Sequence, residues 1–138
     1  MKYLLDTNVI SELRKSNCNK RVKAFADKIQ WEDSYISVIS IGELCYGIEK
    51  LPVEKKKHEL LIWFYTKIPE WFSARIITLD TEVLTKWGKI RASVKRTLPV
   101  MDSLIAAAAM THNMVLVTRN VSDFEGIEGL NIINPWEF

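Results

Sequence analysis

The stretch Tyr3-Leu4-Leu5-Asp6-Thr7-Asn8-Val9-Ile10 decides the fold of this chain. In it, a short apolar run passes directly into an acidic and polar triplet, after which apolar residues return. This pattern predicts a buried strand over Lys2–Leu5, followed at once by a helix over Val9–Arg14, which is the βα order of a parallel α/β protein. No cap or turn explains so abrupt a charge after the strand, so we interpret Asp6 as a functional residue.

The alternation of strand and helix continues along the chain. Four further β-rich runs predict strands at Tyr35–Val38, Arg75–Leu79, Val115–Thr118 and Asn131–Ile133. Apolar periodicity predicts helices over Arg21–Ile29, over Ser40–Lys50, around Leu61, Phe64, Tyr65 and Ile68 with an end at Pro69, around Val83, Trp87, Ile90 and Val94, and from Pro99 and Asp102 through Ala106–Ala109. Only a turn-like stretch, Arg119–Gly129, separates the last two strands. The pattern therefore predicts helices on both faces of a five-stranded parallel sheet.

Length and composition are those of a globular protein. The 138 residues fit one domain, residues 1–138, and 48% hydrophobic with 26% charged residues exclude a disordered or fibrous chain. Only two cysteines are present, and no apolar stretch is long enough for a signal peptide or a membrane span, so we expect a cytoplasmic protein. The net charge of +2 argues against binding of nucleic acid by bulk charge alone.

Four acidic residues follow predicted strands directly or lie at the start of a helix: Asp6, Glu43, Asp102 and Asp123. Ligands of open parallel sheets bind at the carboxyl ends of the strands, so we expect these side chains at one edge of the sheet. Except for Asp6, each also has a structural explanation. Ser40-Ile41-Gly42-Glu43 fits a capping box, Asp102 suits a helix N-terminus, and Asp123 suits a turn.

Taken together, the four carboxylates indicate a metal site. Crowded carboxylates repel one another unless a cation is present, and hard cations such as Mg²⁺ or Mn²⁺ prefer oxygen ligands. A cation placed there can activate water against a phosphodiester. Neutral side chains beside the acids would orient them, and the candidates are Thr7, Asn8, Thr118 and Asn120. Without the four acids, 13 of the 17 acidic residues remain against 19 basic ones. The near-neutral net charge therefore conceals an acidic pocket in an otherwise basic protein.

These residues resemble the PIN-domain nucleases, and in particular the VapC-type toxins of type II toxin–antitoxin pairs, including FitB-like members. The resemblance is carried by blocks that stand in the family's order from one end of the chain to the other, namely Tyr3–Ile10, Ser40–Glu49, Leu98–Ala107, Thr118–Phe124 and Asn134–Trp136. Ser103 stands where many members have alanine. The segment Arg91–Thr97 is less typical and more basic, so no substrate preference is carried over through it.

The resemblance implies a three-layer α/β/α PIN-like sandwich with strand order 3-2-1-4-5. It also implies an Mg²⁺- or Mn²⁺-dependent endoribonuclease that is inhibited by a cognate VapB-type antitoxin, whose C-terminal segment wraps the toxin. On this resemblance the catalytic and metal-binding acids are Asp6, Glu43, Asp102 and Asp123, and the accessory polar positions are Thr118 and Asn120, with Thr7 or Asn8. We expect a tRNA or an rRNA as the substrate and a homodimer within a larger toxin–antitoxin complex, without membrane contact.

A basic stretch leads into Asp102 and is the candidate RNA-contacting surface. It contains five cations and no acid: Lys86, Lys89, Arg91, Lys95 and Arg96. Such a stretch can contact an RNA backbone, or it can be a solvated helix face. The two histidines, His58 and His112, lie in a lysine run and near a helix end, and they give no support to a metal-free ribonuclease mechanism.

Three other functions remain as alternatives. An RNA-processing PIN nuclease without an antitoxin would use the same site. A receiver-like phosphotransfer domain would use Asp80, at the end of the third strand, as phosphoacceptor; it requires a lysine after the last strand, where Asn134-Pro135-Trp136 stands. A catalytically silent PIN-like binding module is the third alternative, which the intact acids disfavour.

Overall fold

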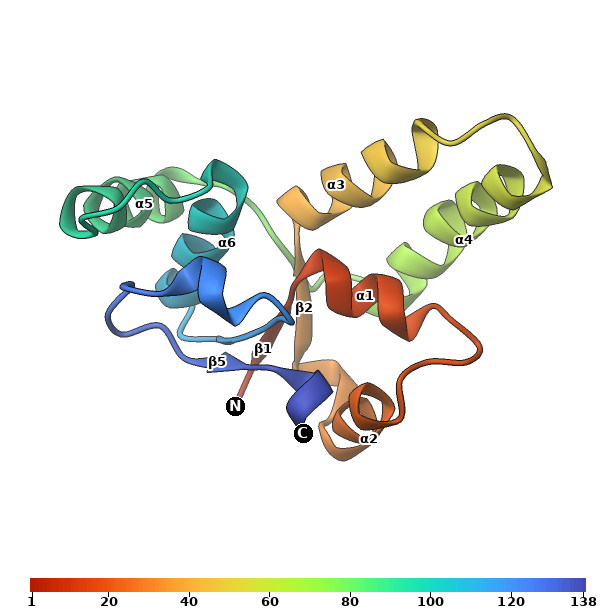
Figure 1. Ribbon diagram of the computed structural model, residues 1–138, viewed down its shortest axis with the longest axis horizontal. Coiled ribbons are helices and arrows are strands. Elements are labelled where there is room, and N and C mark those ends of the chain that lie inside the picture. The colour runs from red at the N-terminus through yellow and green to blue at the C-terminus, as the bar shows by residue number, and fades with distance from the viewer.

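Five short parallel strands form the centre of the computed structural model, which describes residues 1–138 (Figure 1). They are β1 (Tyr3–Leu5), β2 (Ser34–Ser37), β3 (Ile76–Ile77), β4 (Val115–Val117) and β5 (Ile132–Ile133). Their order in the sheet is β3-β2-β1-β4-β5, and every neighbouring pair is parallel. The five predicted strands and their order are confirmed, with ends that differ by one or two residues from the predicted ones.

Six helices connect and cover the strands: α1 (Thr7–Leu13), α2 (Lys20–Lys28), α3 (Val38–Glu49), α4 (Lys55–Phe72), α5 (Thr81–Ser93) and α6 (Val100–Thr111). All six agree with the predicted helices. Three short 3₁₀ helices were not predicted: η1 (Trp31–Asp33), η2 (Val121–Phe124) and η3 (Pro135–Glu137). A single helical turn contains too few residues for an apolar period, so η2 looks like a plain turn in the sequence. None of the helices combines the length and the hydropathy that crossing a membrane requires.

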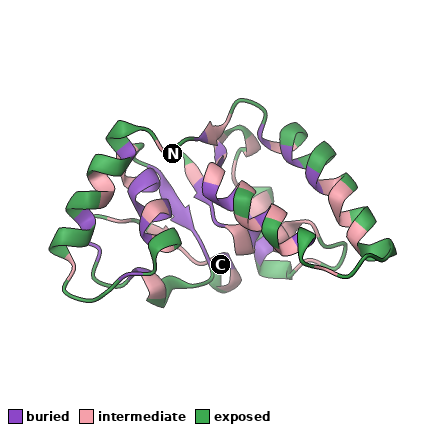
Figure 2. Ribbon diagram, turned by 90° about the horizontal axis from the view of Figure 1, so that it is seen from above, coloured by how far each residue is buried: buried purple, intermediate pink, exposed green.

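The sheet separates two apolar layers. Neighbouring residues of a strand point to opposite faces, so Leu4 and Leu116 pack in one hydrophobic cluster, and Leu5 and Val117 pack in the other. α5 and α6 cover the Leu4 face, α1, α2 and α4 cover the Leu5 face, and α3 contributes to both. Figure 2 shows the strands buried between helices whose outer sides are exposed. The predicted three-layer α/β/α sandwich is therefore confirmed.

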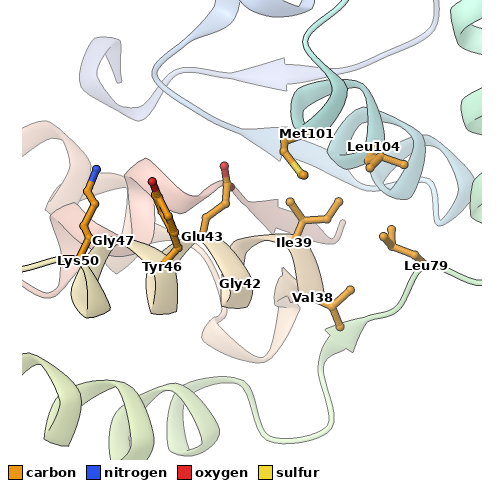
Figure 3. A pocket seen from close by; sticks show the side chains of 10 residues that line it. All are labelled: Val38, Ile39, Gly42, Glu43, Tyr46, Gly47, Lys50, Leu79, Met101 and Leu104. Carbon is orange, nitrogen blue, oxygen red and sulfur yellow. The ribbon is translucent and has the colours of Figure 1, made fainter.

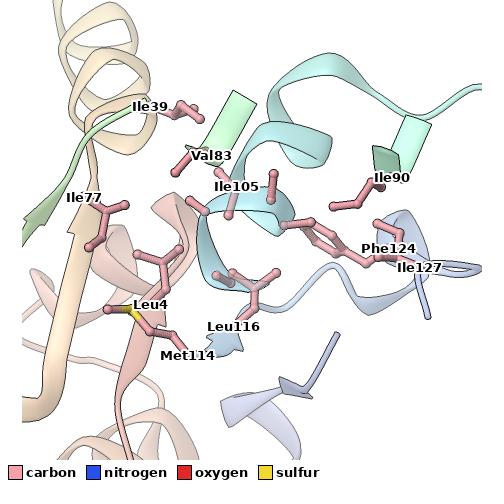
Figure 4. Packing of buried hydrophobic residues seen from close by; sticks show 14 of the residues in the cluster. Leu4, Ile39, Ile77, Val83, Ile90, Ile105, Met114, Leu116, Phe124 and Ile127 are labelled. Carbon is pink, nitrogen blue, oxygen red and sulfur yellow. The ribbon is translucent and has the colours of Figure 1, made fainter. Parts of the chain in front are cut away.

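A run of alanines lets α6 pack closely against the sheet. Ala106–Ala109 are fully buried, and Ile105 beside them packs with Leu116 of β4 and with Phe124 of η2 (Figure 4). α6 leads back into β4, so its first turn, which contains Asp102, lies toward the carboxyl edge of the sheet. The alanine run thus sets the position of one predicted site residue.

Several predicted boundaries are wrong. α4 continues past Pro69 to Phe72, because the fully buried Phe72 ring packs against Trp31 and its burial offsets the hydrogen bond that proline cannot make. Val94, the last residue of a predicted apolar stripe, is the extended C-cap of α5 and lies outside the helix. Val38, predicted as the end of a strand, begins α3.

Candidate active site

β1 and β4 are the neighbouring strands at which the strand order reverses, and Asp6 follows β1 directly. Open parallel sheets bind their ligands at such a switch point. The backbone N–H of Asp6 donates to the carbonyl oxygen of Val117 at 2.9 Å, which continues the β1–β4 pairing. Asp6 is also the N-cap of α1, and its Oδ1 accepts from the N–H of Thr7 at 2.8 Å. The interpretation that no cap explains Asp6 is therefore wrong, because α1 begins two residues before the predicted Val9.

Thr118, the residue that follows β4, holds the second carboxylate oxygen of Asp6. It is fully buried and donates its hydroxyl to Oδ2 of Asp6 at 2.8 Å. The same hydroxyl oxygen accepts from the side-chain amide of Asn8 at 3.3 Å and from the backbone N–H of Asn120 at 3.2 Å. A hydroxyl has one proton and two lone pairs, so the hydrogen-bonding capacity of Thr118 is fully used. The predicted accessory residues thus meet around Asp6, although Asn120 does so through its backbone.

Glu43 is held in the site by Thr7. The hydroxyl of Thr7 donates to Oε1 of Glu43 at 2.6 Å, and the Ser40 hydroxyl lies 3.0 Å from the same Thr7 oxygen. Thr7 has a single hydroxyl proton and the carboxylate can only accept, so the proton in the Thr7–Ser40 contact comes from Ser40. Ser40 is fully buried and was not among the predicted site residues. Its place beside Thr7 depends on the approach of α1 to α3, which no sequence pattern shows.

The capping-box explanation of Glu43 is wrong. α3 begins at Val38, and its N-cap is Ser37, whose hydroxyl oxygen accepts from the N–H of Ser40 at 3.2 Å. A capping box requires the glutamate three residues after the N-cap, and Ser40 occupies that position. Glu43 therefore lies in the second turn of α3, where it has no role at the helix N-terminus.

Asp102 and Asp123 reach the site from α6 and η2. Asp102 lies in the first turn of α6, as the helix-terminus explanation requires, and Asp123 lies in the single turn of η2. The pKa of Asp102 is raised to about 6, mainly by burial and in addition by the charges of Asp6, Asp123 and Glu43. Since charges act in this way only over short distances, the four carboxylates lie in one neighbourhood.

The same mutual repulsion acts on Asp6. Burial is the main cause that raises the pKa of Asp6, hydrogen bonds from Thr118 and Thr7 lower it, and the charges of Glu43 and Asp123 raise it again. None of the five ion pairs in the structure includes any of these carboxylates. As the side chains stand, no three acidic, histidine or cysteine side chains lie close enough together to hold one metal ion. The four acids therefore repel one another, and no basic side chain neutralises them. As they stand, they do not form a complete set of metal ligands.

Two of the candidate RNA-contacting cations lie far from Asp102. Lys86 and Lys89 of α5 line a hollow of about 490 Å³ together with Met110 and Thr111, at the C-terminal end of α6. Asp102 is in the first turn of the same helix, which rises about 1.5 Å per residue, so more than two turns separate it from this hollow.

The other three cations have different surroundings. The Arg91 guanidinium stacks over the ring of Trp87, 4.9 Å from its centroid, and Trp87 Nε1 donates to Oγ of Ser103 at 2.8 Å. Arg91 therefore lies toward the Asp102 end of α6. Lys95 and Arg96 follow the end of α5, and Arg96 donates to backbone carbonyls of η2 and of the residue after it. The basic stretch is thus divided among three places.

A cleft of about 710 Å³ opens between α3 and α6 beside the acids (Figure 3). Glu43, Tyr46 and Lys50 line it from α3, and Met101 and Leu104 line it from α6. Most of its walls are apolar, and the Tyr46 side chain is largely exposed. Glu43 also lines a second hollow of about 330 Å³ toward α1 and α4. The acidic edge is therefore open on both sides of Glu43.

Asp80, the phosphoacceptor of the receiver alternative, has a structural role. It is the N-cap of α5, and its Oδ1 accepts from the N–H of Val83 at 3.0 Å. Receiver domains have the strand order 2-1-3-4-5, which differs from the order found here. The receiver alternative is therefore excluded.

The fold and the site define a parallel α/β/α protein with a cluster of four carboxylates at the β1–β4 switch point. The chain belongs to the PIN domain family, whose model matches residues 3–129. It is 34% identical to the VapC ribonuclease Y4jK of Sinorhizobium fredii over 137 residues, which are 97% of each protein. The family resemblance found in the sequence is thereby confirmed.

The chain is also similar to a toxin and to solved structures of toxin complexes. The chain is 35% identical to the toxin FitB of Neisseria gonorrhoeae over 136 residues, 96% of this chain and 97% of FitB. The crystal structure of FitAcB from that organism matches with a TM-score of 0.90 and 34% identity over 99% of both chains. A toxin–antitoxin complex from Klebsiella pneumoniae matches with a TM-score of 0.72 and 26% identity, over 97% of this chain and 98% of that one.

Proposed function

We propose that this chain is the toxin of a toxin–antitoxin pair and acts as a divalent-metal-dependent endoribonuclease, with residues 1–138 forming a single PIN domain. The relationship to a VapC ribonuclease and to the toxin FitB over nearly the whole chain supports the proposal. The observation that carries it is the group of four carboxylates that repel one another at the switch point and have no side-chain counter-ion.

The donor set fits a hard divalent cation, Mg²⁺ or Mn²⁺. Asp6, Asp102 and Asp123 would hold it, and Glu43 would bind it directly or through water. All the donors are carboxylate oxygens, which both cations prefer, and a cation would counteract the burial and the repulsion that together raise the pKa of Asp102. Mg²⁺ keeps several of its waters in proteins, so the carboxylates need not all contact it. When bound, the cation would activate water and offset the charge that develops on the phosphodiester.

The neutral residues of the site orient the acids. The N–H of Thr7 and the hydroxyl of Thr118 hold the two oxygens of Asp6, so this carboxylate is fixed in direction. The Thr7 hydroxyl holds Oε1 of Glu43 and leaves the other oxygen of that carboxylate free. Because Thr7 contacts both acids, it fixes the position of one relative to the other, which is what positioning of a water and a scissile bond requires.

The substrate is RNA, with tRNA and rRNA as the two classes to test, and the site of action is the cytoplasm. Lys86, Lys89, Arg91 and Lys95 are proposed to contact the RNA backbone, and Arg91 lies toward the Asp102 end of α6. Arg96, the fifth candidate, donates instead to backbone carbonyls of η2 and of the residue after it. Water attacks the phosphorus and the bond to the 3′ oxygen breaks, so the products carry 3′-hydroxyl and 5′-phosphate ends.

Cleavage of purified total RNA tests the enzymatic part of this proposal. We expect cleavage with Mg²⁺ or Mn²⁺, none with a chelator, and none with Asp6→Asn in any condition. Asp27→Asn, which changes an exposed aspartate of α2, is the matched control and should cleave like the parent. Mapping of the product ends identifies the nucleophile. Cleavage in chelator, full activity of Asp6→Asn, or 2′,3′-cyclic phosphate ends would each reject the mechanism.

The toxin role is tested by growth. Expression of the chain should arrest growth, and co-expression of the adjacent small reading frame should restore it and yield a complex of the two proteins, with the toxin as a homodimer. Growth arrest by Asp6→Asn would reject the link between toxicity and cleavage. If RNA is cleaved but no neighbouring protein inhibits the cleavage, the chain is an RNA-processing PIN nuclease instead.

A further inference from the structure

Arg96 links the connection between α5 and α6 to the short helix that contains Asp123. Its Nη2 donates to the carbonyl oxygens of Asp123 and Glu125, each at 2.9 Å, and reaches that of Ser122 at 3.5 Å. Its Nε donates to the Glu125 carbonyl at 3.1 Å. We propose that Arg96 is a positioning residue that sets the place of the Asp123 carboxylate in the site. The proposal rests on the proposed nuclease function.

The orientation of Asp123 depends on its backbone. Asp6 is held by Thr7 and Thr118, and Glu43 is held by Thr7, but no hydrogen bond holds the Asp123 carboxylate itself. Its main chain is tied on both sides instead, by the N–H that donates to the Asn120 carbonyl at 3.1 Å and by the carbonyl that accepts from Arg96. Loss of either tie would let the carboxylate move.

The buried Phe124 ring anchors η2 in the core, but η2 has few hydrogen bonds to other elements. It is four residues long, and its N-cap residue, Asn120, makes no side-chain capping hydrogen bond. The last carbonyls of a helix have no partner within the helix and are stabilised by a cation near them. Arg96 supplies both the donors and the charge at this end, so it is the main tie of η2 to the α5–α6 connection.

The planar fork of arginine is essential to this contact. Nε–H and the two N–H groups of Nη2, three of the five donors of a guanidinium, point at the carbonyls of Asp123 and Glu125. A lysine ammonium has the same charge but cannot bind two carbonyls in this planar geometry. An RNA phosphate, in contrast, attracts either cation. Replacement of Arg96 by lysine therefore separates a positioning role from a phosphate contact.

Steady-state cleavage of RNA and amide hydrogen exchange of residues 121–125 test the proposal together. We expect Arg96→Lys and Arg96→Ala both to lower kcat by about 10- to 100-fold, the usual effect of removing a residue that orients a ligand side chain, with KM unchanged. Exchange of the η2 amides should be faster in both variants. Arg21→Lys, at an exposed arginine of α2 whose side chain makes no hydrogen bond, is the matched control and should match the parent in all three measurements.

Each alternative has its own signature. If Arg96→Lys keeps the parental kcat and exchange, charge rather than the fork matters and the proposal is wrong. If KM rises and the dependence of RNA binding on salt weakens by about one phosphate contact, Arg96 binds RNA instead. A parent without ribonuclease activity would reject the proposed function, while the exchange measurement would still decide whether Arg96 holds η2.

Discussion

The hydroxyl of Thr118 donates to Oδ2 of Asp6 at 2.8 Å, although 112 residues separate them along the chain. Each follows its strand directly, and only the pairing of β1 with β4 brings the two together. Asp6 is 5% exposed and Thr118 is fully buried. A buried carboxylate is costly to ionise unless donors surround it, so Thr118 is a main reason why Asp6 can carry a charge inside the molecule.

Replacement of Thr118 by valine should therefore weaken both stability and activity. Thr118→Val keeps the shape of the side chain but leaves Asp6, Asn8 and Asn120 without their shared partner. We expect the free energy of unfolding to fall by about 1–3 kcal/mol, measured by urea denaturation, and cleavage to fall by about 10- to 100-fold. Thr118→Ser keeps the hydroxyl and should retain most of both. A valine variant that equals the parent would show that this hydrogen bond is unimportant.

Removal of the Ser40 hydroxyl should affect the site from a distance. Ser40→Ala takes away the proton donor to Thr7, which in turn holds Glu43. We expect kcat to fall by about tenfold, with a loss of about 1 kcal/mol in the free energy of unfolding. Thr66→Ala removes the hydroxyl of an exposed threonine of α4 that bonds only to a backbone carbonyl, and it serves as the control. Equal kcat values for the two variants would contradict the role of Ser40.

The order and type of the elements could be predicted from the sequence because the core imposes regular spacing. The continuous apolar runs Tyr3–Leu5 and Val115–Val117 reflect strands with both faces buried, and each of the first three strands is followed by an α-helix. The end of α4 could not be predicted in the same way. Its last turn survives Pro69 because Phe72 is buried, and burial against a distant Trp31 has no local signal.

The acids of the site could be predicted because each follows a strand or lies near the start of a helix, and a parallel α/β sheet brings such positions to one edge. Their supporting contacts could not. The contact of Ser40 with Thr7 depends on how α1 approaches α3. Arg96 binds backbone carbonyls, which every residue has, so no side-chain pattern identifies its target. The basic stretch suggested one RNA surface, whereas the end of α5 at Ser93 separates its members.

The stability of the protein should depend strongly on the last turn of α4. Phe72→Ala would open a cavity in the layer formed by α1, α2 and α4, where the parental ring is fully buried. We expect a loss of about 3–5 kcal/mol in the free energy of unfolding. Ile62→Ala, at a half-exposed position of the same helix, is the control and should cost far less. Similar losses in the two variants, measured by urea denaturation, would contradict the described end of α4.

Asp102 makes the stability of the chain depend on pH. Its carboxyl has a pKa of about 6 in the folded chain, above the ordinary 3.8, because of burial and of the neighbouring Asp6, Asp123 and Glu43. Between these two values the folded chain keeps a proton that the unfolded chain has released. The contribution of Asp102 to the free energy of unfolding therefore falls as the pH rises from about 4 to about 6. Above about pH 6 this contribution is fully lost.

Asp102→Asn should remove this loss, since asparagine has no proton to release and no charge to repel its neighbours. We expect this variant to melt a few degrees above the parent at about pH 8, and the difference in Tm to shrink as the pH is lowered toward about 4. Mn²⁺ should raise the Tm of the parent more than that of the variant, because it neutralises the same carboxylates. Asp27→Asn, the exposed control in α2, should follow the parent at every pH. If Asp102→Asn instead melts below the parent at about pH 8 without metal, the favourable interaction of Asp102 with the N-terminus of α6 outweighs the repulsion among the four acids.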